Sequence, residues 1–209
     1  MATDHREAAR VDGPAQVGDG RRARRDRNKV RVLDAVIELF SEDQLVPSAH
    51  AVAARSGVSL RSIYRYFDDQ DGLLRAAIDR HFERMAPLAT ITELGEGDLD
   101  TRIERLVTAR LRLYRAVAPT ARAARAGRHA DNLIGREVAR ARHALLRQVE
   151  QHFAPELDAL TAEERHATLA AVDVLCQHAA LDHLDLQRRL SQDEIHDVLT
   201  RALRRLLTP

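Results

Sequence analysis

Residues 47–67 read PSAHAVAARSGVSLRSIYRYF, and this stretch decides the fold. Ser48 follows a proline and precedes alanines, a position where serine typically caps a helix by accepting a hydrogen bond from its first turn. Gly57 comes soon after, and glycine is the usual residue where a chain needs positive φ to leave a helix. Ser59 can cap again directly afterwards. The stretch therefore predicts two short helices joined by a tight turn.

Small and apolar residues predict how these two helices pack. Ala53 and Gly57 are small where the helices would cross, and Val52, Val58 and Ile63 would bury the joint. This is the geometry of a helix-turn-helix, whose second helix lies in the major groove of DNA. The face left free for base edges, phosphates and sugars consists of Leu60, Arg61, Ser62, Tyr64, Arg65 and Tyr66.

Apolar periodicity continues the helical pattern on both sides. Apolar residues at i, i+3, i+4 and i+7 predict a helix that ends at about Ser41. They are Leu33, Val36, Ile37 and Phe40. Three aspartates within residues 68–71 favour the start of a further helix, which Pro87 would end.

The segments VLDAVIELF at 32–40, SGVS at 56–59 and IYRYF at 63–67 resemble, in this order, the TetR family of bacterial repressors. The resemblance covers about residues 29–85. It implies an all-α fold, in which a three-helix domain with the helix-turn-helix is joined by a fourth helix to a larger helical domain for ligand binding and dimerisation. The implied partners are a palindromic double-stranded DNA operator, a small-molecule inducer and a second copy of the chain.

Matched position by position, the resemblance also implies which residues contact DNA. Tyr64 corresponds to the family's phosphate-contacting tyrosine. The implied DNA-binding residues are Ser48, His50, Ser59, Leu60, Arg61, Ser62, Tyr64, Arg65, Tyr66 and Gln70. Gln70 is a departure, because the family usually has a phosphate-clamping lysine there, and we expect weaker anchoring at this point.

Charge is unevenly distributed along the chain. Residues 21–31 carry seven positive charges and one negative, a local sum of +6, so the formal net charge of +1 leaves −5 for the rest. Lys29 is the only lysine among 33 basic residues. We expect Arg21, Arg22, Arg24 and Arg25 to form a basic arm that contacts DNA phosphates or an adjacent minor groove. The alternative is a solvated tail or helix face.

Composition narrows the remaining possibilities for the 209 residues. Only 3% of them are aromatic, and Gly and Pro are sparse, which favours helices over strands. Cys176 is the only cysteine, which excludes intramolecular disulfides and Cys-based zinc sites. The chain has no signal-peptide pattern and no apolar run long enough to cross a membrane. We therefore expect a cytoplasmic protein without a membrane partner.

The domain organisation follows from these signals. We expect a disordered tail at residues 1–20, the DNA-binding domain at 21–68 and the helical ligand-binding and dimerisation domain at 69–209. Capping boxes of the form [ST]-x-x-E predict helix starts near residues 101, 161 and 191. They pair Thr101 with Glu104, Thr161 with Glu164 and Ser191 with Glu194. Pro119 predicts a separate short helix that ends near Gly127.

The C-terminal half also contains candidates for a pocket and an interface. The family packs several of its helices around a cavity, which implies the pocket residues Phe82, Leu111, Tyr114, Leu146, Leu175 and His178. Residues 169–184 and the last helix are apolar on more than one side, which is typical of a helix that packs on its own domain and on a partner. The dimer-interface candidates are Leu169, Val172, Cys176, Val198, Ala202 and Leu206.

Other functions are weaker alternatives. His178, Asp182, His183 and Asp185 lie within two turns, but nothing in the sequence completes a metal site, so we expect neither a metal nor another cofactor. No catalytic motif is present, and we expect no enzymatic activity. The alternative class is a helical protein that binds a metal or a small molecule, or an adapter, without DNA binding.

Overall fold

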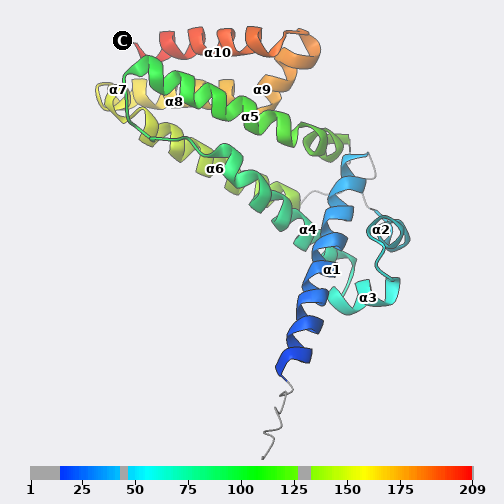
Figure 1. Cartoon of the computed structure of the whole chain (residues 1–209). Helices are drawn as coiled ribbons and strands as arrows, with labels where there is room; N and C mark the ends of the chain where they lie inside the picture. Colours follow the sequence, from blue (N-terminus) through cyan, green and yellow to red (C-terminus); the bar gives the residue numbers. More distant parts are fainter. Residues whose placement is uncertain (1–14, 43–46, 127–132, 209) are drawn as a thin grey trace, which may run out of the picture.

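The computed structural model describes residues 15–42, 47–126 and 133–208. This part of the chain is helical and contains no strand, which confirms the expected all-α class (Figure 1). The N-terminal elements are α1 (Ala15–Ser41), α2 (Ala49–Ser56), α3 (Leu60–Tyr66), α4 (Gln70–Met85) and the 3-10 turn η1 (Ala86–Ala89). The C-terminal elements are α5 (Leu99–Ala126), α6 (Leu133–His152), α7 (Ala154–Asp158), α8 (Ala162–Cys176), α9 (His178–Asp182), the π turn η2 (His183–Gln187) and α10 (Gln192–Leu207).

The N-terminal helices share a first hydrophobic core. It contains Val32, Ala35, Val36 and Leu39 of α1, Val52 of α2, Val58 of the turn, Ile63 of α3, and Leu73 and Ala77 of α4. The predicted packing of Val52, Val58 and Ile63 is therefore correct. Because α4 contributes two buried residues, this core extends past the predicted domain boundary after residue 68.

The C-terminal helices enclose a second, larger core. α5 lies at its centre and packs against α10 and α9, while α8 packs against α6 and α10 (Figure 1). Its fully buried side chains include Ile103, Leu106, Phe153, Leu157 and Leu199. The capping boxes predicted at Thr161 and Ser191 are both present and start α8 and α10.

α4 connects the two cores. It packs on α1 and also contacts α5 and α6. Asp34 of α1 accepts hydrogen bonds from Arg80 Nε at 2.8 Å and Arg80 Nη2 at 3.0 Å, and from Arg84 Nη1 at 3.0 Å. These cations hold the pKa of Asp34 below its ordinary value. A displacement of α4 is therefore expected to move α1 with it.

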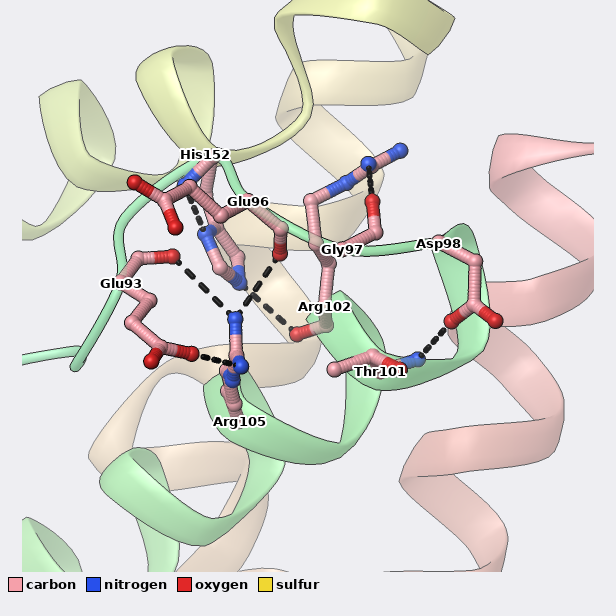
Figure 2. Close-up of polar contacts among 9 residues, drawn as sticks. Glu93, Glu96, Gly97, Asp98, Thr101, Arg102, Arg105 and His152 are labelled. Atoms are coloured by element: carbon pink, nitrogen blue, oxygen red, sulfur yellow. Dashed lines mark hydrogen bonds and ion pairs between the residues drawn. The ribbon is translucent and has the colours of Figure 1, made fainter.

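The loop between η1 and α5 is closed by polar contacts with α5 and α6 (Figure 2). The fully buried ring of His152 accepts a hydrogen bond from Gly95 N–H at Nδ1 (2.9 Å) and lies 2.8 Å from the Arg102 carbonyl through Nε2. Since the carbonyl can only accept, Nε2 carries the ring proton and His152 is neutral. Burial also lowers the pKa of His152 below its ordinary value of 6.5, which favours the neutral ring.

Two predictions about helix starts differ from the structure. α1 begins at Ala15, so residues 15–20 of the expected tail are helical, and residues 1–14 lie outside the described residues. Each residue added to an existing helix gains a hydrogen bond, which favours such an extension. The capping box at Thr101 is wrong, because Asp98 Oδ1 already accepts from Thr101 N–H at 2.8 Å and the helix starts at Leu99.

Two helix interruptions were also placed wrongly. Pro119 lies inside the continuous helix α5, where its missing N–H leaves one backbone hydrogen bond unmade, and Gly127 lies outside the described residues. By contrast, residues 169–184 are not one helix. Gln177 has extended backbone angles (φ −69°, ψ 144°) and separates α8 from α9.

Candidate functional site

The turn between α2 and α3 has the geometry that the sequence predicts. Ser48 Oγ accepts from Ala51 N–H at 3.2 Å and Ser59 Oγ from Ser62 N–H at 3.4 Å, so both predicted caps are confirmed. Gly57 has a φ of +65°. The nearest atom to a Cβ at this position would be Nη2 of the flexible Arg31 side chain at 2.8 Å, which can move aside, so the turn requires glycine for its conformation.

The outer face of α3 carries three exposed side chains. Arg61, Tyr64 and Arg65 point to solvent, with 60% of Tyr64 exposed, whereas Ile63 is 1% exposed and anchors the helix. Arg65 donates to Ser62 Oγ at 3.5 Å, and its guanidinium lies 5.4 Å from the centre of the Tyr66 ring. The face therefore combines two cations with a free aromatic ring.

Tyr66 differs from its predicted place in the groove. Its half-buried ring packs against the first core, and its hydroxyl accepts a hydrogen bond from Asn28 Nδ2 at 3.5 Å. This hydrogen bond lowers the pKa of Tyr66. Tyr66 thus holds α3 against α1, which leaves it less free to contact DNA than Tyr64.

The basic run belongs to a helix that projects from the first core. The N-terminal turns of α1 extend past α3 (Figure 1). Arg21 and Arg25 fall on the helical stripe that continues through Asn28 to Val32, and Asn28 contacts α3 while Val32 is buried beneath α2 and α3. Arg21 and Arg25 therefore face the same side of α1 as the helix-turn-helix, with Arg22 and Arg24 at the edges of that stripe.

The arginines of this run lack carboxylate partners within the described part of the chain. Arg21, Arg22, Arg24 and Arg25 are all exposed. Among the described residues, the first carboxylate along the sequence that forms an ion pair is Asp34, and the first arginine that does so is Arg55. These four arginines thus have no ion-pair partner among the residues that the structure describes.

The start of α4 lies next to the start of α2. Gln70 Nε2 donates to the Pro47 carbonyl at 3.5 Å, so Gln70 lies close to the exposed residues Ser48 and His50. Helix N-termini attract anions. However, exposed aspartates at 68, 69 and 71 surround Gln70 and oppose that attraction.

A cavity of about 710 Å³ lies between the two cores. α1, α4, α5, α6, α8 and α9 all contribute to its walls, which are largely apolar. Of the predicted pocket residues, Phe82, Tyr114 and His178 line it. Leu111, Leu146 and Leu175 do not; Leu111 is buried in the second core and Leu175 packs on that core. Sequence reasoning missed Arg110, Gln148 and the contribution of Cys176.

Several polar side chains around the cavity are engaged with one another. Thr120 Oγ1 lies 3.1 Å from His81 Nε2, and burial lowers the pKa of His81. The Tyr114 hydroxyl donates to Asp185 at 2.7 Å, while the Tyr114 ring lies 4.9 Å from that of His178. Among the described residues, no group of three or more His, Cys, Asp or Glu is arranged to hold a metal ion.

Comparisons with known proteins bear on the fold. No family model matches the sequence, and no curated protein matches it either. A TetR-family transcriptional regulator from Streptomyces coelicolor has a similar structure, with a TM-score of 0.68 and 22% identity over 87% of this chain and 80% of that one. The chain has the fold of TetR-family regulators.

Two further structures share this TetR fold. A TetR-like transcriptional regulator from Rhodococcus sp. RHA1 matches with a TM-score of 0.62 and 20% identity, over 85% of this chain and 94% of that one. A transcriptional regulator from the same organism matches with a TM-score of 0.60 and 18% identity, over 86% and 95%. The similarity therefore includes both the N-terminal half, which contains the helix-turn-helix, and the C-terminal half of the chain.

The predicted dimer face of the TetR fold is only partly available on the surface. Val172 is 0% exposed and belongs to the chain's own core, so it cannot contact a partner, and Cys176 lines the cavity. Val198 is 40% exposed, whereas Leu169, Ala202 and Leu206 are half-buried. Val174, which was not among the candidates, is 63% exposed on α8.

No described helix is long and apolar enough to cross a membrane.

Proposed function

We propose that this protein is a DNA-binding transcriptional regulator, a cytoplasmic homodimer that represses by binding a palindromic operator and responds to a small ligand. One observation carries the proposal. The exposed face of α3 and the exposed arginines of α1 lie on the same side of a single packed core. A basic surface beside a helix-turn-helix suits the major groove and the phosphates that flank it.

The side chains have separate roles in this proposal. Arg61 and Arg65 reach base edges, since a guanidinium can bond guanine in a forked geometry. Tyr64, Ser48, Ser59 and His50 contact phosphates, which fix the register without specifying sequence. Arg21, Arg22, Arg24 and Arg25 follow the duplex beyond the half-site, where each neutralised phosphate releases counterions.

Dimerisation follows from the need to bind two half-sites. A palindrome presents its half-sites about 34 Å apart, and a two-fold dimer is the simplest arrangement that meets both. α8 and α10 pack together and expose Val174 and Val198, with the half-buried Leu169, Ala202 and Leu206 as further apolar surface. This surface is the proposed interface.

The position of the cavity supports a response to ligand. Phe40 of α1, Ile78 of α4 and Val138 of α6 all line it, so its walls belong to both cores. A ligand that fits better when these helices separate would favour a placement of the two DNA-binding units that no longer matches the operator. The Asp34 ion pairs would carry the movement of α4 to α1.

The alternative function is a helical ligand-binding protein or adapter without DNA binding. The cavity and the apolar face of α8 would serve it equally well. The exposed arginines of α1 have no role in that alternative, which is why we favour DNA binding. We propose no catalytic activity.

Tyr64→Ala tests the proposal. DNA selected by the wild-type protein from a random duplex pool is titrated in a gel shift, and circular dichroism follows folding. Because Tyr64 is largely exposed, its loss should weaken DNA binding with no change in the thermal midpoint. Arg165→Ala, on α8 and paired with Asp158, is the control and should bind normally. Equal binding by Tyr64→Ala and wild type would refute the assigned interface.

A further inference from the structure

A buried arginine stands in the wall of the cavity. Arg110 of α5 is 2% exposed and lines the cavity. Its neighbours one turn away, Leu106, Val107 and Tyr114, are buried and uncharged. A well-packed apolar side chain at such a position usually stabilises a protein at least as well as a charge. An oppositely charged partner would therefore offset the cost of burying the Arg110 charge.

The hydrogen bonds of Arg110 do not neutralise its charge. Nη1 donates to Gln148 Oε1 at 3.1 Å and Nη2 donates to the Leu145 carbonyl at 3.1 Å, and both acceptors are uncharged. Burial lowers the pKa of Arg110, but a guanidinium remains protonated in proteins. The ion pairs formed between described residues do not include Arg110.

Neither ionisable neighbour of Arg110 forms an ion pair with it. Burial raises the pKa of the Cys176 thiol to about 11, so Cys176 is uncharged near neutral pH. Asp173 favours the charged form of Arg110 through space without forming an ion pair with it, and the hydrogen bond that its Oδ1 accepts from the neutral Gln177 Nε2 at 2.8 Å holds the carboxylate toward α9. Elsewhere in the wall, Glu137 is paired with Arg140 at 2.5 Å.

We propose that the cavity binds an amphiphile with a single anionic group, such as a carboxylate, and that Arg110 holds that group while the apolar body lies along α1 and α4. This inference rests on the proposed ligand response and specifies its ligand class. The guanidinium fork matches a carboxylate in a bidentate geometry. The remaining wall is suited to an apolar chain, since Phe40, Ile78 and Phe82 line it. Burial of the Arg110 side chain strengthens this attraction, because a charge interacts more strongly away from water.

Three probes with the same chain and different head groups test the charge preference. Decanoate, decanol and decyltrimethylammonium, each below its micellar concentration, are titrated into the full-length protein without DNA by calorimetry at pH 7.5. Decanoate should bind about tenfold more tightly than decanol, because hydrogen bonds to charged groups are the stronger ones. The cationic probe should bind most weakly. Equal affinities, or no binding by decanoate, would overturn the proposal.

Variants of two cavity arginines test the assignment to Arg110. Arg110→Met should remove the preference for decanoate over decanol while decanol binds as before, and Arg110→Lys should retain part of it. Arg142→Met is the matched control, because Arg142 also lines the cavity but is exposed, and it should keep the full preference. If Arg110→Met keeps the preference, or Arg142→Met loses it, Arg110 does not hold the anion.

The wild-type head-group comparison needs no variant, so it remains decisive if Arg110→Met fails to fold. Binding of ligand-free protein to the selected DNA is measured on the same sample. Failure to bind DNA would contradict the proposed function alone, because the calorimetry contains no DNA. Loss of the head-group preference would contradict only the ligand class.

Discussion

The arginines of the two halves of this protein are used differently. In the C-terminal half several are tied to the fold: Arg102 pairs with Glu156 and Arg105 with Glu93, while Arg112 donates to the carbonyls of Leu88 and Thr90 at 2.9 and 2.8 Å. In the first turns of α1, Arg21 and Arg25 are exposed and lie outside the ion pairs of the described residues. Arginine content alone therefore says little about a nucleic-acid partner, whereas a cluster of exposed arginines beside a helix-turn-helix indicates where a polyanion would bind.

The largest expected effect comes from removing the exposed arginines of α1. Replacing Arg21, Arg22, Arg24 and Arg25 with Ala should reduce DNA affinity for all sequences. If all four contact phosphates, the slope of log affinity against log salt should fall by about 3.6. Fluorescence anisotropy at several salt concentrations measures this slope.

The matched control removes four arginines from the other half. Arg112, Arg165, Arg201 and Arg204 are replaced with Ala in one variant, which has the same change in net charge. Its salt slope should equal that of the wild type. An equal loss of slope in both variants would show that DNA binding depends only on net charge. It would contradict the claim that the arginines of the two halves have different roles.

Arg61→Ala and Arg65→Ala test base contacts within the DNA-binding half. Each should cost ~1–3 kcal/mol of binding and relax specificity at one operator position. Neither should change the preference elsewhere in the half-site. Affinities for a set of single-base operator variants measure this, and uniform weakening across the set would assign both arginines to phosphates.

Acid should destabilise the protein through one buried histidine in each half. His152 and His81 have lowered pKa values because they are buried, so the unfolded chain takes up protons first as the pH falls. Their contribution to stability is therefore complete above pH 6.5, the ordinary pKa, and is lost below it. The fully buried His152 alone should account for up to about 1.4 kcal/mol per pH unit.

Urea unfolding at pH 7.5 and 5.5 measures this loss. His152→Gln is the informative variant, because its amide can accept from Gly95 N–H and donate to the Arg102 carbonyl without titrating. It should be less sensitive to acid than the wild type. The same acid sensitivity in both proteins would assign the effect to other groups.

Gln70→Lys should have the smallest effect. A lysine at the start of α4 would add one phosphate contact near Ser48, so the salt slope should rise by about 0.9. The aspartates at 68, 69 and 71 should limit the gain in affinity. Gln70→Met, without a charge, is the control. An unchanged slope in Gln70→Lys would show that the start of α4 does not reach the duplex.

Local features of this fold could be predicted from the sequence, and relations between helices could not. Ser48, Ser59, Thr161 and Ser191 cap helices as predicted, because a cap depends only on residues within one turn. Pro119 and Gln177 show the limit of local signals, because Pro119 lies within α5 and Gln177 interrupts the helix predicted across residues 169–184.

The cavity shows the same limit more sharply. Leu111 was predicted to line the cavity, yet its neighbour Arg110 does so. Adjacent residues on a helix point about 100° apart, so an error of one residue places a side chain on a different face. Val172 was likewise assigned to an interface although it lies in the core. The rotation of a helix against its neighbours is set by the whole core and leaves no local signal.

The central claim is that α3 and the projecting turns of α1 bind one DNA duplex together. Footprinting of the full-length protein on the selected DNA, with hydroxyl radicals, tests it most directly. We predict two protected half-sites related by two-fold symmetry, about one helical turn apart, with flanking protection that the variant lacking Arg21, Arg22, Arg24 and Arg25 loses. Absence of a protected site, or flanking protection that persists in that variant, would contradict the claim.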